Sequence, residues 1–140
     1  MRLVREARAG DAAALVDLIG QLAFDVDEDG VRRRIEKLSE LGEPVLVAER
    51  DGVVVGALDW HVMHTLHRPA PVGRIVMMVV SENDRSQRFG TPLLSEAEAR
   101  MRLAGCTLAE VTSNLRLERA HAFYERCGYA RTSARFGKRL

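Results

Sequence analysis

The chain is poor in cysteine, in aromatic residues and in charge excess of either sign. Its 140 residues include 2 Cys and 5% aromatic residues, and 21 basic side chains stand against 20 acidic ones, for a net charge of +1. Two cysteines outside a C-x-x-C pair exclude a four-cysteine zinc site. The balanced charge disfavours nucleic acid as a partner. What remains has the composition of an ordinary globular domain.

Long apolar runs are missing as well. The longest, Ile75 to Val80, is far too short to cross a bilayer, so we expect no membrane association. Arg2, Arg5, Glu6 and Arg8 stand where a secretory signal would be apolar. We therefore expect a cytoplasmic protein, folded as one domain over residues 1–140.

Apolar periodicity predicts elements in the order β-α-α-β-β-β-α-β-α-β. The expected strands are Leu3–Ala7, Pro44–Arg50, Val53 to about Met63, Gly73–Val80, Thr107–Thr112 and Tyr129–Leu140. Helical stripes begin near Leu15, Val31, Leu93 and Leu117, with Asp11 as the first N-cap and Gly42, Gly105 and Gly128 at helix ends. Asp25–Asp29 and Ser81–Phe89 are predicted loops, and the composition of Gly73–Val80 predicts a strand buried on both faces.

The central strand, polar loop and helix form a unit that suits anion binding. Free N–H groups at a helix N-terminus, together with the helix dipole, favour a phosphate group. The loop from Ser81 to Phe89 leads into a helix that begins at Gly90. Neither G-x-G-x-x-G nor G-K-[ST] occurs, which excludes the two common nucleotide-binding motifs.

Two motifs resemble those of the GNAT superfamily of acyl-CoA-dependent N-acyltransferases. Arg85, Gly90, Leu93 and Leu94 match the family's loop-and-helix pattern [Q/R]-x-x-G-x-[G/A] with paired leucines. Asn114, followed by Ala120-His-Ala-Phe-Tyr-Glu-Arg-Cys-Gly-Tyr129, matches its second motif at fixed offsets. The resemblance covers essentially the whole chain and implies an α/β (α+β) fold with a mixed, mostly antiparallel central sheet flanked by helices.

The resemblance also implies a cofactor and a mechanism. Acetyl-CoA would bind along Met78, Val79 and Val80 and at Arg85, Ser86, Gln87, Arg88, Phe89, Gly90 and Thr91, with Asn114 against the pantetheine arm. The strands ending at Val80 and Thr112 would splay apart around the thioester, and an N–H near Val80 would stabilise the oxyanion. Tyr124 would be the general acid that protonates the departing thiolate and would also contact the cofactor.

The sequence departs from the family pattern at two points. Ser86 and Arg88 occupy loop positions where glycine is usual; the Arg88 guanidinium could pair with a phosphate or could obstruct the site. The strand Gly73–Val80 also lacks the acid that often serves as general base. Glu110 on the neighbouring strand is our candidate, with Glu82 next and solvent as a further option.

The acceptor is predicted to be a small primary amine. Within the superfamily the likeness is greatest to aminoalkylphosphonate N-acetyltransferases, through Glu49–Gly56, His61–His67, Thr112–Asn114, Ala120–Tyr124 and Arg135–Lys138. Arg74, His61 and His64 are the candidate substrate contacts, Arg74 for an anionic group. We expect no metal site, because strand residues three apart point to opposite faces.

Two other functions stay open, and one assembly is expected. The chain could be a degenerate GNAT domain that binds acyl-CoA or a protein without catalysis. It could instead acetylate a peptide or protein amine that the acidic segment Asp25–Asp29 attracts. The C-terminal strand is the candidate contact for a homodimer.

Overall fold

The central sheet has five strands in the spatial order β1-β2-β3-β4-β5. The computed structural model describes residues 1–140, except the side chains of Ser86 and Gln87. The strands are β1 (Arg2–Glu6), β2 (Leu46–Arg50), β3 (Val53–Met63), β4 (Val72–Val80) and β5 (Leu108–Val111). The first four pair antiparallel and β5 joins β4 in parallel. The predicted mixed, mostly antiparallel sheet is confirmed.

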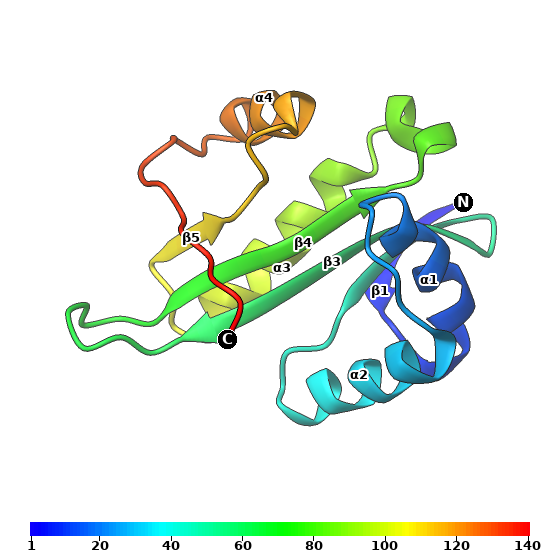
Figure 1. Ribbon diagram of the computed structural model, residues 1–140, viewed down its shortest axis with the longest axis horizontal. Coiled ribbons are helices and arrows are strands. Elements are labelled where there is room, and N and C mark those ends of the chain that lie inside the picture. The colour runs from blue at the N-terminus through cyan, green and yellow to red at the C-terminus, as the bar shows by residue number, and fades with distance from the viewer.

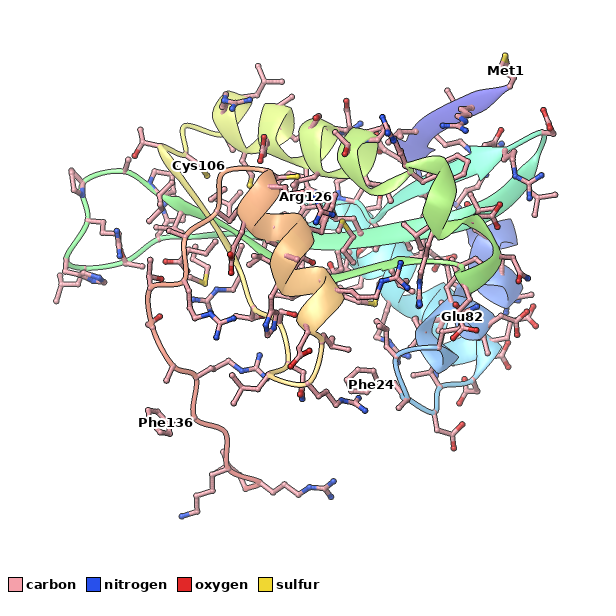
Figure 2. All side chains as sticks on the ribbon, turned by 90° about the horizontal axis from the view of Figure 1, so that it is seen from above. Met1, Phe24, Glu82, Cys106, Arg126 and Phe136 are labelled. Carbon is pink, nitrogen blue, oxygen red and sulfur yellow. The ribbon has the colours of Figure 1, made fainter. Side chains whose placement is uncertain are left out.

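Helices cover both faces of this sheet (Figures 1 and 2). They are α1 (Ala12–Gly20), α2 (Glu28–Glu40), α3 (Gly90–Leu103) and α4 (Glu118–Arg126), with short 3₁₀ helices η1 (Ala9–Asp11) and η2 (Glu82–Gln87). On one face α3 packs its buried side chains onto Leu46, Leu58 and Ile75. On the other face α1 and α2 pack onto Val47, Ala57 and Val79. The alternation of each strand thus supplies two separate cores.

Local sequence explains where most elements begin and end. Asp27 caps α2, since its Oδ1 accepts a hydrogen bond from the Gly30 N–H at 2.6 Å. The predicted loop Asp25–Asp29 therefore ends earlier than expected, because its acidic residues form the cap and first turn of α2. Likewise the predicted loop after β4 contains η2. No described helix has the length and apolar character that a membrane span requires.

Two expectations about strands are wrong. Within the described chain, residues after Tyr129 form no strand, and Phe136 is 92% exposed on a segment that runs away from the body (Figure 2). That segment is rich in basic residues and offers too little apolar area to hold a strand in place. In addition, β4 is not buried on both faces, because Val76 is 38% exposed. The pairing of β5 with β4 ends at Ile75, so no neighbouring strand flanks Val76 on that edge in the described chain.

Candidate active site

The candidate site begins where β5 leaves β4. The parallel pairing runs from Val72 opposite Leu108 to Ile75 opposite Val111, and the Thr112 N–H donates a last hydrogen bond to the Ile75 carbonyl at 3.3 Å. Beyond that point β4 continues to Val80 without a strand partner on this edge in the described chain. The predicted splay of the two strands is therefore present, and it exposes one edge of β4.

A bulge in β4 decides which peptide groups face the open edge. Asp59 pairs with Met77 and Trp60 with Ile75, so Val76 is an extra residue on β4. The Ser81 N–H donates to the Val55 carbonyl at 2.8 Å, toward β3. Because peptide groups alternate along a strand, those of Met78 and Val80 face the open edge and that of Val79 faces β3. The peptide groups of Met78 and Val80 can thus pair with an extended ligand. Val79 instead contributes a buried side chain to the core under α1 and α2.

The loop after β4 leads into the N-terminus of α3. Arg85 Nε donates to the Val80 carbonyl at 3.2 Å, which folds the loop back over the end of β4. Arg88 has φ 62° and ψ 42°, a left-handed conformation that favours glycine. The buried Phe89 precedes α3, whose first turn receives no side-chain cap, and Thr91 in that turn is exposed. The predicted cofactor residues Ser86 and Gln87 have side chains outside the described part.

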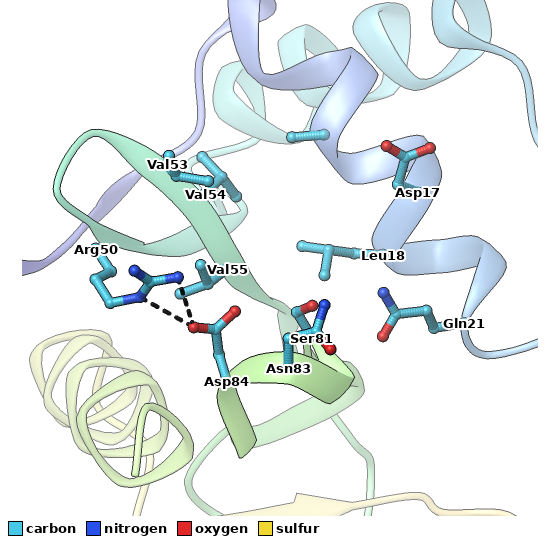
Figure 3. Close-up of a pocket in the computed structure, with 11 residues that line it drawn as sticks. Asp17, Leu18, Gln21, Arg50, Val53, Val54, Val55, Ser81, Asn83 and Asp84 are labelled. Atoms are coloured by element: carbon cyan, nitrogen blue, oxygen red, sulfur yellow. Dashed lines mark hydrogen bonds and ion pairs between the residues drawn. The ribbon is translucent and has the colours of Figure 1, made fainter. Parts of the chain in front are cut away.

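Two contacts tie this loop to the rest of the fold, and Figure 3 shows the first of them. Arg50 at the end of β2 pairs with the buried Asp84, at 2.9 Å from Nη2 and 3.0 Å from Nε to Oδ1. Gln21, just after α1, accepts a hydrogen bond from the Glu82 N–H at 3.1 Å through its Oε1. Together they flank a cavity of about 420 Å³ between α1, the β2–β3 hairpin and η2. The loop is therefore anchored on the side away from α4.

Helix α4 brings Tyr124 to the α3 side of the sheet. A Cβ at Gly90 would lie 3.1 Å from Phe123 Cζ, so the glycine at the start of α3 makes room for α4. The Tyr124 ring is 7% exposed and packs edge-on against Phe123 and Tyr129, with ring centroids 5.5 and 6.1 Å away. Burial, and secondarily Cys127, raise the pKa of Tyr124 to about 12. Tyr124 thus keeps its proton at neutral pH.

Asn114 organises the turn that precedes α4. Its Oδ1 accepts a hydrogen bond from the Arg116 N–H at 3.1 Å. Its carbonyl accepts from the Leu117 N–H at 3.0 Å and lies 2.9 Å from His121 Nε2. These contacts are local, and they leave the Asn114 side-chain amino group as the part that can meet a ligand.

The predicted base and substrate residues lie on the opposite face of the sheet. Glu110 pairs with Arg74 at 2.8 Å, so the candidate base and the candidate anion contact neutralise each other. His61 stands opposite Arg74 in the β3–β4 register. His64 lies just beyond β3 and is exposed, and the exposed Glu82 lies on the loop over α1. Within the described residues, no cluster of three or more His, Cys, Asp or Glu side chains suits a metal ion.

Two acidic residues beside His61 were missed from sequence. Glu43 Oε1 lies 3.3 Å from His61 Nδ1, and Asp59 Oδ1 lies 3.7 Å from His61 Nε2. Glu43 Oε2 also accepts a hydrogen bond from the Val62 N–H. Asp59 could have been found as an acid inside a strand that otherwise alternates between two cores. Glu43 carried no such signal, because it precedes β2 and meets His61 only in the fold.

Comparisons with known proteins show the family of this chain. A model of the Acetyltransferase (GNAT) family matches residues 13–129. An aminoalkylphosphonate N-acetyltransferase from Salmonella typhimurium is 39% identical over 94 residues, which cover 67% of this chain and 61% of that protein. An aminoglycoside N(6')-acetyltransferase type 1 from Stenotrophomonas maltophilia is 30% identical over 135 residues, 92% of this chain and 86% of that protein.

The fold is shared with solved structures as well. The aminoglycoside N-acetyltransferase AAC(6')-Iy in complex with CoA superposes with a TM-score of 0.88 over 100% of this chain and 95% of that chain, at 16% identity. The family match includes the open edge of β4, the loop after it and Tyr124. The chain therefore belongs to the Acetyltransferase (GNAT) family.

Proposed function

We propose that this chain transfers the acetyl group of acetyl-CoA to the primary amine of a small molecule, with Tyr124 as general acid. The observation that carries the proposal is the open edge of β4 together with a buried, protonated tyrosine on the α3 side of the sheet. A strand edge with unpaired peptide groups suits the amides of a pantetheine arm. A protonated phenol suits a leaving thiolate, which needs a proton as the C–S bond breaks.

The cofactor would lie along β4 and end at the start of α3. The peptide groups of Met78 and Val80 would hold the pantetheine arm, and the Val80 N–H would stabilise the developing oxyanion. The uncapped first turn of α3 suits the diphosphate, and the charges of Arg85 and Arg88 support it. The left-handed backbone at Arg88 is the conformation that favours glycine, the residue usual at this position of the family pattern, and it supports a loop of the same shape.

For the acceptor we propose an aminoalkylphosphonate as the first candidate. The support is the 39% identity to the Salmonella typhimurium protein of that name, of whose length this chain spans 61%. Arg74 can meet a phosphonate only in competition with Glu110, which it already pairs at 2.8 Å. An aminoglycoside is the second candidate, because the Stenotrophomonas maltophilia relative carries that name.

The test is the release of free thiol from acetyl-CoA in the presence of a panel of amines. The panel holds an aminoalkylphosphonate, the same amine without its phosphonate, an aminoglycoside and a basic peptide. We expect release above background with the aminoalkylphosphonate and less with the amine that lacks the phosphonate. Release with the peptide alone would favour a protein acetyltransferase. Binding of acetyl-CoA without release for any amine would favour a domain that binds and does not catalyse.

A further inference from the structure

Tyr124 and the open edge of β4 do not meet one requirement of the reaction, which is the removal of a proton from the acceptor amine. An alkylamine is mostly protonated at neutral pH, and an ammonium nitrogen has no lone pair with which to attack a thioester. A group on the acceptor side must take that proton. The sequence candidate Glu110 is held by Arg74 at 2.8 Å, and Glu82 is exposed on the loop over α1. Neither is a free base beside the gap.

The side chains of Asp59 and His61 share one face of the sheet. Ala57, in the same alternation, packs under α1 and α2, whereas Leu58 and Trp60 pack under α3. Asp59 and His61 therefore point away from α3, on the side of the sheet opposite Tyr124. Across the sheet Asp59 faces Met77, the first residue beyond the bulge, and His61 faces Arg74. The pair thus lies level with the point where β5 leaves β4.

The contacts of Asp59 and His61 suit two groups that exchange a proton. His61 stands between two carboxylates, Glu43 at 3.3 Å from Nδ1 and Asp59 at 3.7 Å from Nε2. Asp59 Oδ1 is buried and has no hydrogen-bond partner among the described residues. Burial raises the pKa of Asp59. The nearby His61 lowers this pKa and Glu43 raises it, and the net direction is upward. The other charges that face the pair, Arg74 and Glu110, neutralise each other.

We infer that Asp59 and His61, braced by Glu43, form the general base that takes the proton from the substrate ammonium. The inference rests on the proposed function. The N–H bond of the ammonium breaks and its proton passes to the pair and then to solvent. The freed amine forms the C–N bond as the C–S bond breaks. Tyr124 protonates the thiolate and regains the second proton that the nitrogen loses. Acid and base then act from opposite faces of the sheet.

The experiment compares pH profiles of kcat/KM for the wild type, Asp59→Asn, His61→Gln and the control His67→Gln, which removes a histidine from the exposed loop after β3. The assay uses thiol release with an amine that the wild type accepts, from pH 6 to pH 10. We expect both site variants to lose about 10²–10³-fold at pH 7. The loss should shrink by about tenfold per pH unit as the amine deprotonates in solution. Acetyl-CoA affinity and the control should match the wild type.

Several outcomes would overturn the inference, and they can be told apart. A loss of the same size at every pH would assign the pair a structural role. Activity equal to the wild type at pH 7 would exclude the pair as the base. If Asp59→Asn melts early, His61→Gln decides alone, because that side chain is half-exposed. If the wild type itself acetylates no amine while binding acetyl-CoA, the proposed function fails and the base has no reaction to serve.

Discussion

At the scale of single residues, Tyr124 carries the most specific claim. Its ring is fixed between Phe123 and Tyr129, and burial keeps its hydroxyl protonated. Tyr124→Phe keeps the ring packing and removes only the acid. We expect kcat to fall by about 10²-fold or more while acetyl-CoA affinity stays within about threefold. Thiol-release kinetics and calorimetric binding measure the two quantities. Equal turnover of wild type and variant would contradict the assignment.

Gly73 is a residue-scale test of the packing beneath the site. A Cβ there would lie 2.3 Å from Met101 Sδ and 2.5 Å from Met101 Cγ. Gly73→Ala must displace a buried side chain in a full core, so we expect a loss of about 1–3 kcal/mol in the free energy of unfolding. Gly20→Ala is the matched control, since nothing lies within 4 Å of its added Cβ. Denaturant unfolding measures both. Equal stability of the two variants would mean that α3 is loosely packed on β4.

At the scale of elements, the ion pair between Arg50 and Asp84 connects β2 to the cofactor loop. Asp84→Asn should leave the loop less ordered, so that acetyl-CoA must order it on binding. We expect the Kd for acetyl-CoA to rise about tenfold, which corresponds to about 1.4 kcal/mol. Glu82→Gln makes the same chemical change at an exposed position in the same loop and should leave the Kd within about twofold. Isothermal calorimetry measures the Kd of both variants. Equal Kd values would show that the ion pair does not contribute to acetyl-CoA binding.

A second element-scale contact joins β1 to the start of α1. Asp11 accepts hydrogen bonds from Arg5 at 2.8 and 3.0 Å and from the Arg8 N–H at 2.9 Å. Burial would raise the pKa of Asp11, but these donors outweigh it and lower the pKa below its usual value. A carboxylate with a lowered pKa stabilises the fold above its unfolded pKa of 3.8, and that contribution is lost as pH falls through the folded pKa.

Asp11→Asn should therefore lower the free energy of unfolding by about 2 kcal/mol at pH 7. The difference from the wild type should begin to shrink below about pH 4, where the carboxylate of the unfolded chain takes up a proton, and should be lost as the pH falls through the lowered pKa of the folded state. Urea unfolding at several pH values follows it. Asp25→Asn, on an exposed loop, should change stability by less than about 0.5 kcal/mol at every pH. A difference that persists at pH 2 would show that charge is not the cause.

At the scale of the whole molecule, ligand binding should appear as thermal stabilisation. A ligand at about 100 times its Kd adds about 2.7 kcal/mol to the folded state. For a chain of this length we expect acetyl-CoA to raise Tm by about 8 °C. ADP, which lacks the pantetheine arm and cannot use the open edge of β4, should raise it less. Scanning calorimetry decides. Equal Tm shifts for the two ligands would show that Met78 and Val80 do not bind acetyl-CoA.

The sequence predicted the elements that depend on local pattern. The strand Val53–Met63 has the expected bounds, and β4 and α3 begin within a residue of expectation. The predicted strand Tyr129–Leu140 is absent, because a strand needs a neighbouring strand and a buried face, and Phe136 is 92% exposed. Asn114, Tyr124 and Gly90 could be singled out as candidates because the motif fixes their spacing along the chain.

The sequence by itself determined the family, the order of the helices and strands up to α4, and Tyr124 as the candidate acid, because periodicity and fixed offsets are local properties. Only the tertiary structure decided what depends on distant segments meeting. The bulge at Val76 sets which peptide groups face the gap, and the register of β4 and β5 pairs Arg74 with Glu110. Glu43 comes within reach of His61 for the same reason. Charges separated along the chain interact according to distance in space, and the fold alone fixes that distance.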